Sequence, residues 1–191
     1  MYTAISDPYC YQDTDILINI PGIINEEILG EFEAAITTQR ADEGFPTGDF
    51  DITHYKSIHY HLFQDIYSWA GEYRTIRISK NTSSFCYPEN IPDQMGRLFQ
   101  LLNTNNRLQN LNAETFSNKL ADFLSNLNAI HPFREGNGRI QNIFITLLSE
   151  QAGHPIDFNK IDVKNLLDVM IKGFNGDNLP LEQLIFKSLT K

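Results

Sequence analysis

The chain of 191 residues lacks most features of secreted, membrane and nucleic-acid-binding proteins. Its two cysteines, Cys10 and Cys86, are too few for a disulfide framework, which fits a reducing compartment. Basic residues are outnumbered by acidic ones, 15 to 24, and the net charge of -9 argues against nucleic-acid and anionic-membrane partners. No run of about 18 apolar residues is present to span a membrane, and residues 1–15 do not resemble a signal peptide. We therefore expect a soluble cytoplasmic protein.

The sequence does contain apolar residues at helical spacing along most of its length. Asn25 and Asp51 are typical N-cap residues. The apolar faces that follow them would consist of Ile28, Leu29, Phe32 and Ile36 in one helix and Ile58, Leu62, Ile66 and Trp69 in the next. The same spacing predicts helices around 95–102, 116–127, 140–148, 161–171 and 179–189, with Gly153 ending the helix of 140–148. The pattern predicts a single all-α domain over residues 1–191.

One segment departs from the helical pattern. Residues 74–79, RTIRIS, alternate polar and apolar side chains as a strand does, and the turn-forming run 81–84, NTSS, follows. We therefore expect a β-hairpin over residues 73–87.

The segment HPFREGNGRIQN, residues 131–142, combines groups that together suit phosphate chemistry. Glycines at 136 and 138 permit positive φ, so that backbone N–H groups can turn inward around an anion. The helix that follows adds its unpaired N–H groups and its positive dipole end, and Arg139 can donate two parallel hydrogen bonds. Glu135 is suited to bind Mg²⁺, and His131 titrates near neutrality. No GxxxxGK(S/T) motif occurs, which argues against a P-loop NTPase.

Each of these residues also has a plain structural explanation. Gly-Asn-Gly before a helix is a common turn, and His131 before Pro132 can simply end the preceding helix. His59 and His61 sit two residues apart, on different helix faces, so we assign them structural or surface roles rather than metal binding. Cys86 has no accompanying His/Asp pattern and is expected to be a passive thiol. The combination within 131–139 is what favours a functional site.

At these residues the sequence resembles the Fic-domain family. HPFREGNGR matches the family signature HxFx(D/E)GNGRxxR at every specified position from His131 to Arg139. Residues 62–74 and 78–85 resemble the helix and hairpin that precede the motif, and residues 7–19, within an N-terminal lead-in of 1–25, resemble that of stand-alone bacterial members. The resemblance implies the Fic fold, a bundle of about seven or eight helices with a hairpin flap at 73–87 beside the motif loop at 131–142.

The resemblance also implies an activity, protein adenylylation, in which AMP passes from ATP to a Tyr, Thr or Ser hydroxyl of a target protein. His131 would be the general base and Glu135 the ligand for Mg²⁺. The phosphates would be held by Gly136, Asn137, Gly138 and Arg139. The flap residues implied to dock the target as an added strand are Ser79, Lys80 and Phe85.

The chain departs from the signature at its last position, where the family has a second arginine and this sequence has Asn142. In the family that arginine helps to hold the γ-phosphate. Its loss weakens the grip on the phosphate tail by about 1.5–3 kcal/mol, the scale of one charged hydrogen bond. Two alternatives to adenylylation therefore stay open: a transferase that uses another donor or group, and a nucleotide-binding regulatory module with weakened catalysis.

The sequence also lacks the inhibitory motif (S/T)xxxE(G/N) that restrains many family members. The resemblance then implies a toxin-like protein whose inhibitory helix is carried by a separate small antitoxin. Asn142 weakens that inference, because the usual partner of the inhibitory glutamate is missing. The protein would act in its own cytoplasm or after delivery into another cell.

Overall fold

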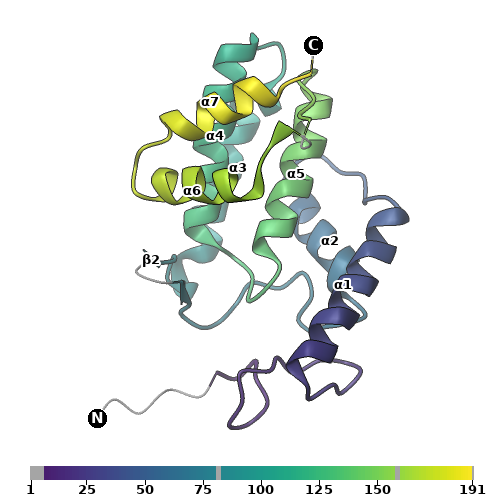
Figure 1. The fold of residues 1–191 in the computed structure, drawn as a ribbon. Coiled ribbons are helices and arrows are strands. Elements are labelled where there is room, and N and C mark those ends of the chain that lie inside the picture. The colour runs from purple at the N-terminus through teal and green to yellow at the C-terminus, as the bar shows by residue number, and fades with distance from the viewer. Residues whose placement is uncertain (1–6, 81–82, 158–159, 191) are drawn as a thin grey trace.

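The computed structural model describes residues 7–80, 83–157 and 160–190. Within these ranges seven α-helices follow one another (Figure 1): α1 Glu26–Asp42, α2 Ile52–Phe63, α3 Ile91–Thr104, α4 Ala113–Ile130, α5 Asn137–Gln151, α6 Val163–Phe174 and α7 Leu179–Ser188. Two short 3-10 helices, Pro88–Asn90 and Asn106–Leu108, flank α3, and the strands β1 Ser79–Lys80 and β2 Ser83–Ser84 precede it. The predicted all-α architecture is confirmed.

Local sequence signals set several of the helix ends. The side chain of Asn25 accepts a hydrogen bond from the amide of Ile28, and that of Asp51 accepts one from His54, so both predicted N-caps are confirmed. After α5 the chain turns at Gly153, whose φ of 80° is the left-handed conformation expected after a helix end.

Two predicted elements differ from the structure. The helix expected to continue to Trp69 ends at Phe63, although Ile66 beyond it is fully buried, because the next residues form turns that still face the core. Ile28 is 54% exposed, so it does not belong to the buried face of α1. Apolar spacing identifies a face but not which of its members meets a neighbour.

The hairpin expected over 73–87 is much shorter than predicted. Its ladder pairs Ser79 with Ser84 and Lys80 with Ser83, and one further backbone bond of 3.3 Å runs from Phe85 N to Ile78 O. Outside this pairing, the described residues of 73–87 have no strand assignment. The side chain of Lys80 and the residues 81–82 lie outside the described part of the structure.

Helix α4 is the centre of the fold. It contacts α3, α5, α6 and α7, and its buried face belongs to the main core. Figure 1 shows α1 and α2 on one side of α5, with α6 and α7 on the other. The end of α4 and the beginning of α5 are joined by residues 131–136, so the most strongly predicted functional segment connects two core helices. None of the described helices has the length and apolar character needed to cross a membrane.

Candidate active site

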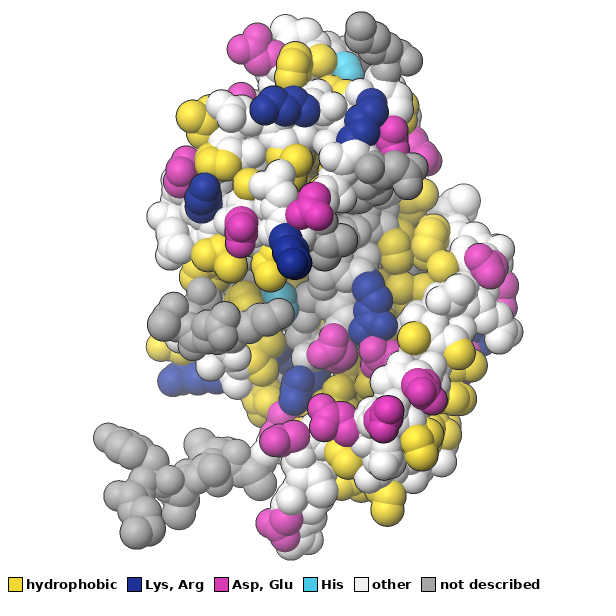
Figure 2. All heavy atoms as spheres, in the orientation of Figure 1, with side chains coloured by type: hydrophobic (Ala, Val, Ile, Leu, Met, Phe, Trp, Pro, Cys, Tyr) yellow, Lys and Arg dark blue, Asp and Glu magenta, His cyan; other side chains and the backbone are white. Residues whose placement is uncertain are grey.

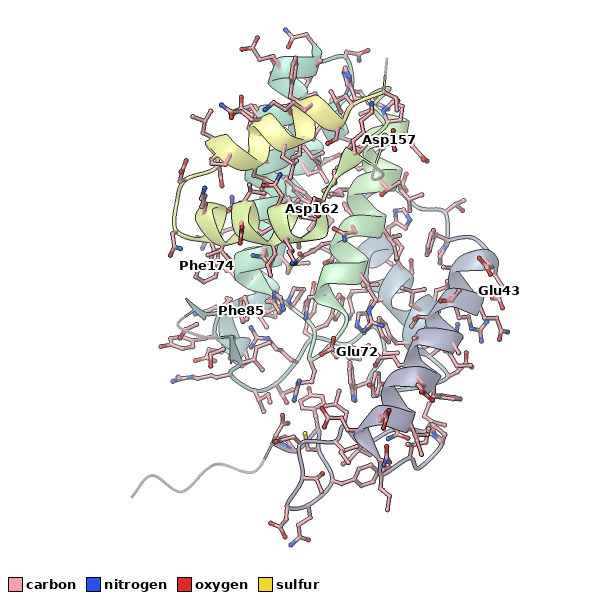
Figure 3. The ribbon with its side chains drawn as sticks, in the orientation of Figure 1. Glu43, Glu72, Phe85, Asp157, Asp162 and Phe174 are labelled. Atoms are coloured by element: carbon pink, nitrogen blue, oxygen red, sulfur yellow. The ribbon has the colours of Figure 1, made fainter. Side chains whose placement is uncertain are left out.

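A cavity of about 1230 Å³ opens over the loop between α4 and α5. It is lined by nearly all of the residues that the sequence singled out, namely Ser79, Phe85, His131, Glu135, Gly136, Asn137, Gly138, Arg139 and Asn142. We call residues 131–139, of which all but the buried Pro132 and Phe133 line the cavity, its floor. Its roof is Phe85 together with Leu166, Leu167, Met170, Ile171 and Phe174 of α6. Figure 3 shows Phe85 and Phe174 near each other, and their rings meet edge to face at 5.9 Å.

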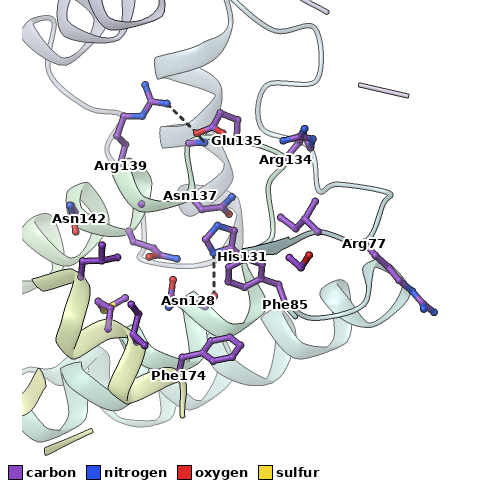
Figure 4. Close-up of a pocket in the computed structure, with 18 of the residues that line it drawn as sticks. Arg77, Phe85, Asn128, His131, Arg134, Glu135, Asn137, Arg139, Asn142 and Phe174 are labelled. Carbon is purple, nitrogen blue, oxygen red and sulfur yellow. Dashed lines mark hydrogen bonds and ion pairs between the residues drawn. The ribbon is translucent and has the colours of Figure 1, made fainter. Parts of the chain in front are cut away.

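His131 occupies the C-cap of α4 in a left-handed conformation, with φ 50° and ψ 64°. Its Nδ1 lies 3.2 Å from the carbonyl oxygen of Asn128, a contact marked in Figure 4. A carbonyl can only accept, so this bond places the proton of the neutral ring on Nδ1 and the lone pair on Nε2. The ring of Phe85 stacks on the imidazole, with centroids 3.9 Å apart and an interplanar angle of 17°. The imidazole is thus fixed from two sides.

Arg74 holds the end of α4 against the segment before the hairpin. Its guanidinium donates to four carbonyl oxygens, those of His131, Ile76, Cys86 and Ile130, at 2.6–3.2 Å. The side chain is almost fully buried, and this burial lowers the pKa of Arg74. The alternation of residues 74–79 does not distinguish an arginine that satisfies buried carbonyls from one that faces solvent.

Phe133 and His59 form the support beneath the loop. Phe133 is fully buried and stacks on His59 with ring centroids 3.8 Å apart. Nδ1 of His59 accepts from the amide of Gly71 at 2.8 Å, and its Nε2 donates to the carbonyl of Glu135 at 3.1 Å. Burial lowers the pKa of His59 to about 3, so the ring is neutral. The structural role expected for His59 is therefore a specific one, since it fixes the backbone of the loop.

Gly136 provides the turn into α5. Its φ is 80°, and a Cβ built there would lie 2.4 Å from an atom of the Phe63 ring. Any side chain at this position would be both strained and in collision with a core residue. The positive φ that we expected at Gly138 is not observed: Gly138 lies within α5, and a Cβ there would meet nothing within 4 Å. The open space at Gly138 adjoins the cavity, which lets a ligand approach the backbone closely.

The side chain of Asn137 closes the loop. Its Oδ1 accepts from the amide of Phe133 at 2.9 Å, and its Nδ2 donates to the carbonyl of Phe133 at 2.8 Å. Both ends of the amide are engaged, and the residue is 3% exposed. The side-chain phosphate contact expected for Asn137 stays a prediction, while its observed contacts shape the loop.

The beginning of α5 presents unpaired backbone donors to the cavity. The first bond within the helix runs from the amide of Ile140 to the carbonyl of Gly136 at 3.1 Å. The amides of Asn137, Gly138 and Arg139 therefore have no partner inside α5. Together with the positive end of the helix dipole, they form the type of anion site found where helices bind phosphate.

Acidic and basic side chains meet beside these donors. The carboxylate oxygen Oε1 of Glu135 accepts from the amide of Gly136 at 2.8 Å and lies 3.5 Å from Nη2 of Arg139. Figure 4 places Glu135 and Arg139 on the side of the loop opposite Phe174. The same Nη2 lies 2.6 Å from Glu33 of α1. Asn142 is exposed one turn further along α5, at the edge of the cavity.

The fit of a magnesium ion can be judged from these contacts. Among the described residues no cluster of three or more His, Cys, Asp or Glu side chains is arranged to hold a metal. Glu135 is 45% exposed and has one carboxylate oxygen engaged by protein donors. This suits Mg²⁺ bound by one carboxylate, substrate phosphates and water, as is usual for this ion.

The N-terminal lead-in reaches the site through an ion pair. Arg134 in the loop donates from Nε and Nη2 to one carboxylate oxygen of Asp7, at 3.0 and 2.8 Å. Tyr9 then packs edge to face on Trp69, 5.6 Å between centroids. The segment that resembled a family lead-in is therefore attached directly to the motif loop.

Cys86 shows no sign of activation. Burial raises the pKa of its thiol, and the sulfur lies 3.4 Å from the carbonyl of Tyr87. A thiol held in its protonated form is a poor nucleophile, in agreement with the passive role expected.

Comparison with known proteins places the chain in a family. Residues 49–149, more than half of the 191, match the model of the Fic/DOC family. This chain belongs to the Fic/DOC family.

Particular members are similar over nearly the whole chain. The chain is 45% identical over 181 residues to the probable protein adenylyltransferase y4lH of Sinorhizobium fredii. The matched residues cover 94% of each protein. It is 34% identical over 193 residues to the protein adenylyltransferase VbhT of Bartonella schoenbuchensis. That match covers all of this chain and 40% of VbhT. The crystal structure of BepC from Bartonella tribocorum with bound AMPPNP is 26% identical and superposes with a TM-score of 0.87, over 95% of this chain and 96% of that one.

Proposed function

We propose that this protein is an adenylyltransferase that transfers AMP from ATP to a Tyr, Thr or Ser hydroxyl of a target protein. The observation that carries the proposal is the joining of α4 and α5. The junction sets the His131 imidazole and the unpaired amides of α5 in one cavity of about 1230 Å³. The names of the relatives, protein adenylyltransferase, support the same reaction. We take residues 1–191 to be one Fic domain.

His131 acts as the general base in this proposal. Because its Nδ1–H is directed to Asn128, Nε2 takes the proton of the target hydroxyl. The hydroxyl oxygen forms a bond to the α-phosphorus of ATP, and the bond from that phosphorus to the bridging oxygen of the β-phosphate breaks. AMP remains on the target, and pyrophosphate leaves with the bonding electron pair.

The beginning of α5 stabilises the charge on the phosphates. The amides of Asn137, Gly138 and Arg139 hold phosphate oxygens, and the Arg139 guanidinium holds the β-phosphate as it becomes the leaving group. The preformed turn at Gly136 means that these donors are aligned before the nucleotide arrives. Glu135 would hold the Mg²⁺, which neutralises charge on the phosphates when bound.

The hairpin positions the target. Ser79 lines the cavity in β1, and Phe85 stacks on His131, so a target strand added beside β1 would lie next to the base. With Lys80 these residues form the proposed docking flap. The partner is thus a protein with an exposed hydroxyl-bearing segment.

We also propose that a separate small antitoxin restrains the enzyme, in the cytoplasm or before delivery into another cell.

The test is transfer of labelled AMP from α-labelled ATP to protein in a bacterial lysate. His131→Ala should abolish labelling, whereas His61→Ala, on α2 and outside the cavity, should leave it unchanged. Labelling that persists in His131→Ala at the wild-type rate would disprove the assigned base. The mass added to a modified target separates transfer of AMP from transfer of phosphate.

The effect of Asn142 on nucleotide binding is tested by replacing it with the arginine that the family has at this position. Asn142→Arg should tighten ATP binding about tenfold, the effect of one added charged hydrogen bond to the phosphate tail. Calorimetric titration measures this change. If neither form binds ATP with Mg²⁺, adenylylation from ATP is disproved.

A further inference from the structure

The guanidinium of Arg139 is held by a residue from a distant part of the chain. Its Nη2 lies 2.6 Å from Oε1 of Glu33, 106 residues earlier in the sequence, in the middle of α1. The guanidinium also lies over the ring of Phe63, 4.7 Å from the centroid. One face and one nitrogen of the cation are thereby fixed.

Glu33 is itself fixed in place. Its other oxygen, Oε2, accepts a hydrogen bond of 2.5 Å from the hydroxyl of Tyr67, and the Glu33 side chain is only 15% exposed. Tyr67 is buried and stacks on Trp69, with ring centroids 4.5 Å apart. The anchor of Arg139 is therefore rigid, unlike a surface ion pair between two flexible side chains.

The contacts leave part of the cation for a ligand. The carboxylates of Glu33 and Glu135 both contact Nη2 of Arg139, and within the described ranges its Nε and Nη1 make no hydrogen bond. A guanidinium binds a phosphate best through two parallel N–H groups in one plane. Fixing Nη2 and the plane of the guanidinium orients the remaining nitrogens without using them.

We propose that Glu33 is a positioning residue that orients Arg139 toward the second phosphate of the bound nucleotide. This rests on the proposed function, in which Arg139 holds the β-phosphate. The consequence is selectivity: the Tyr67–Glu33–Arg139 chain makes the site prefer a nucleoside di- or triphosphate to a monophosphate. AMP, with no second phosphate, gains nothing from it.

The experiment measures ADP and AMP affinities of the whole protein by calorimetry. Glu33→Gln keeps the shape of the side chain and removes its charge, and the preference for ADP over AMP should fall about tenfold. Tyr67→Phe keeps the Glu33 carboxylate but removes the hydrogen bond that holds it. The preference for ADP over AMP should then fall less, by about threefold. Figure 2 shows acidic side chains gathered over the beginning of α1, and Glu31→Gln, on the same helix and exposed, is the control for lost charge.

A double-mutant cycle separates positioning from general effects. In an Arg139→Ala background, Glu33→Gln should no longer change the ratio of ADP to AMP affinity. A ratio that is unchanged by Glu33→Gln in the wild type overturns the proposal. Tighter ADP binding by Glu33→Gln also overturns it, since Glu33 would then compete with the phosphate. Failure of the proposed function would instead appear as labelling that survives His131→Ala, in an assay independent of this ratio.

Discussion

The floor of the cavity is fixed by hydrogen bonds and stacked rings within the protein, whereas its roof is made of apolar side chains that are half-buried or exposed. On the floor, Asn137 and Phe133 are buried and bonded to each other. On the roof, Leu167 and Ile171 of α6 line the cavity yet are 53% and 45% exposed.

This difference indicates that the floor and the roof contribute differently to binding and catalysis. Phosphate chemistry requires donors that are aligned before the substrate arrives, and the floor provides them through bonds that need no ligand. Exposed apolar side chains that face a cavity gain by being covered, so a bound nucleotide or target would complete the roof. Changes to the floor should therefore damage folding and activity together, and changes to the exposed residues of the roof, Leu167 and Ile171, should affect binding alone.

The largest effect is expected for Gly136→Ala on the floor. Alanine at φ 80° is strained by about 1–2 kcal/mol, and the clash with Phe63 adds about 1–3 kcal/mol. AMP transfer should fall by about 100-fold, because the beginning of α5 is displaced. Gly153→Ala is the matched control, with the same φ of 80° and no atom within 4 Å of its Cβ. Equal destabilisation of the two variants in urea unfolding would show that the Phe63 contact is unimportant.

The second effect concerns the anchor of α4. Arg74→Lys keeps the charge but cannot reach four carbonyl oxygens, so the free energy of unfolding should fall by about 2–4 kcal/mol. AMP transfer should fall with it, because the carbonyl of His131 is released. Arg97→Lys, whose side chain is 72% exposed, should change stability by less than about 0.5 kcal/mol. Similar unfolding midpoints for both variants would contradict the anchoring role.

The third effect is on acid stability. The pKa of His59 is lowered to about 3 by burial, so below the ordinary value of 6.5 the unfolded chain takes up a proton that the native state excludes. Stability from this residue is complete above pH 6.5 and is lost as the pH falls toward 3, by about 1.4 kcal/mol per pH unit. His59→Gln should flatten that slope between pH 6 and 4. Urea unfolding at several pH values measures it, and parallel slopes in both proteins would exclude His59 as the cause.

The smallest effect on folding is expected at the roof. Leu167→Ser should change the free energy of unfolding by less than about 0.5 kcal/mol and weaken nucleotide binding about threefold through lost apolar contact. Leu179→Ser, on α7, is the control: it is 57% exposed and does not line the cavity. A large loss of stability in Leu167→Ser would mean that the roof is part of the core and would remove the contrast with the floor.

The candidate site was more predictable than the contacts that support it. The run from His131 to Arg139 is contiguous, so its geometry follows from a helix end, a tight turn and a helix start, and most of the predicted residues do line one cavity. The hairpin was overestimated, because alternation over 74–79 reflects a chain that passes between core and solvent without a pairing partner along most of its length. Arg74 lies within the segment that resembles the family, but nothing in the sequence indicates that its side chain is buried.

What the sequence by itself determined are the local features: the N-caps at Asn25 and Asp51, the helical apolar spacing and the motif loop between two core helices. These depend on interactions within a few residues, which a sequence displays directly. Only the tertiary structure decided that Glu33 meets Arg139 and that His59 bonds Glu135, because these pairs are 106 and 76 residues apart. Packing of α1 and α2 against the loop joins them, and no spacing rule along the chain encodes such a contact.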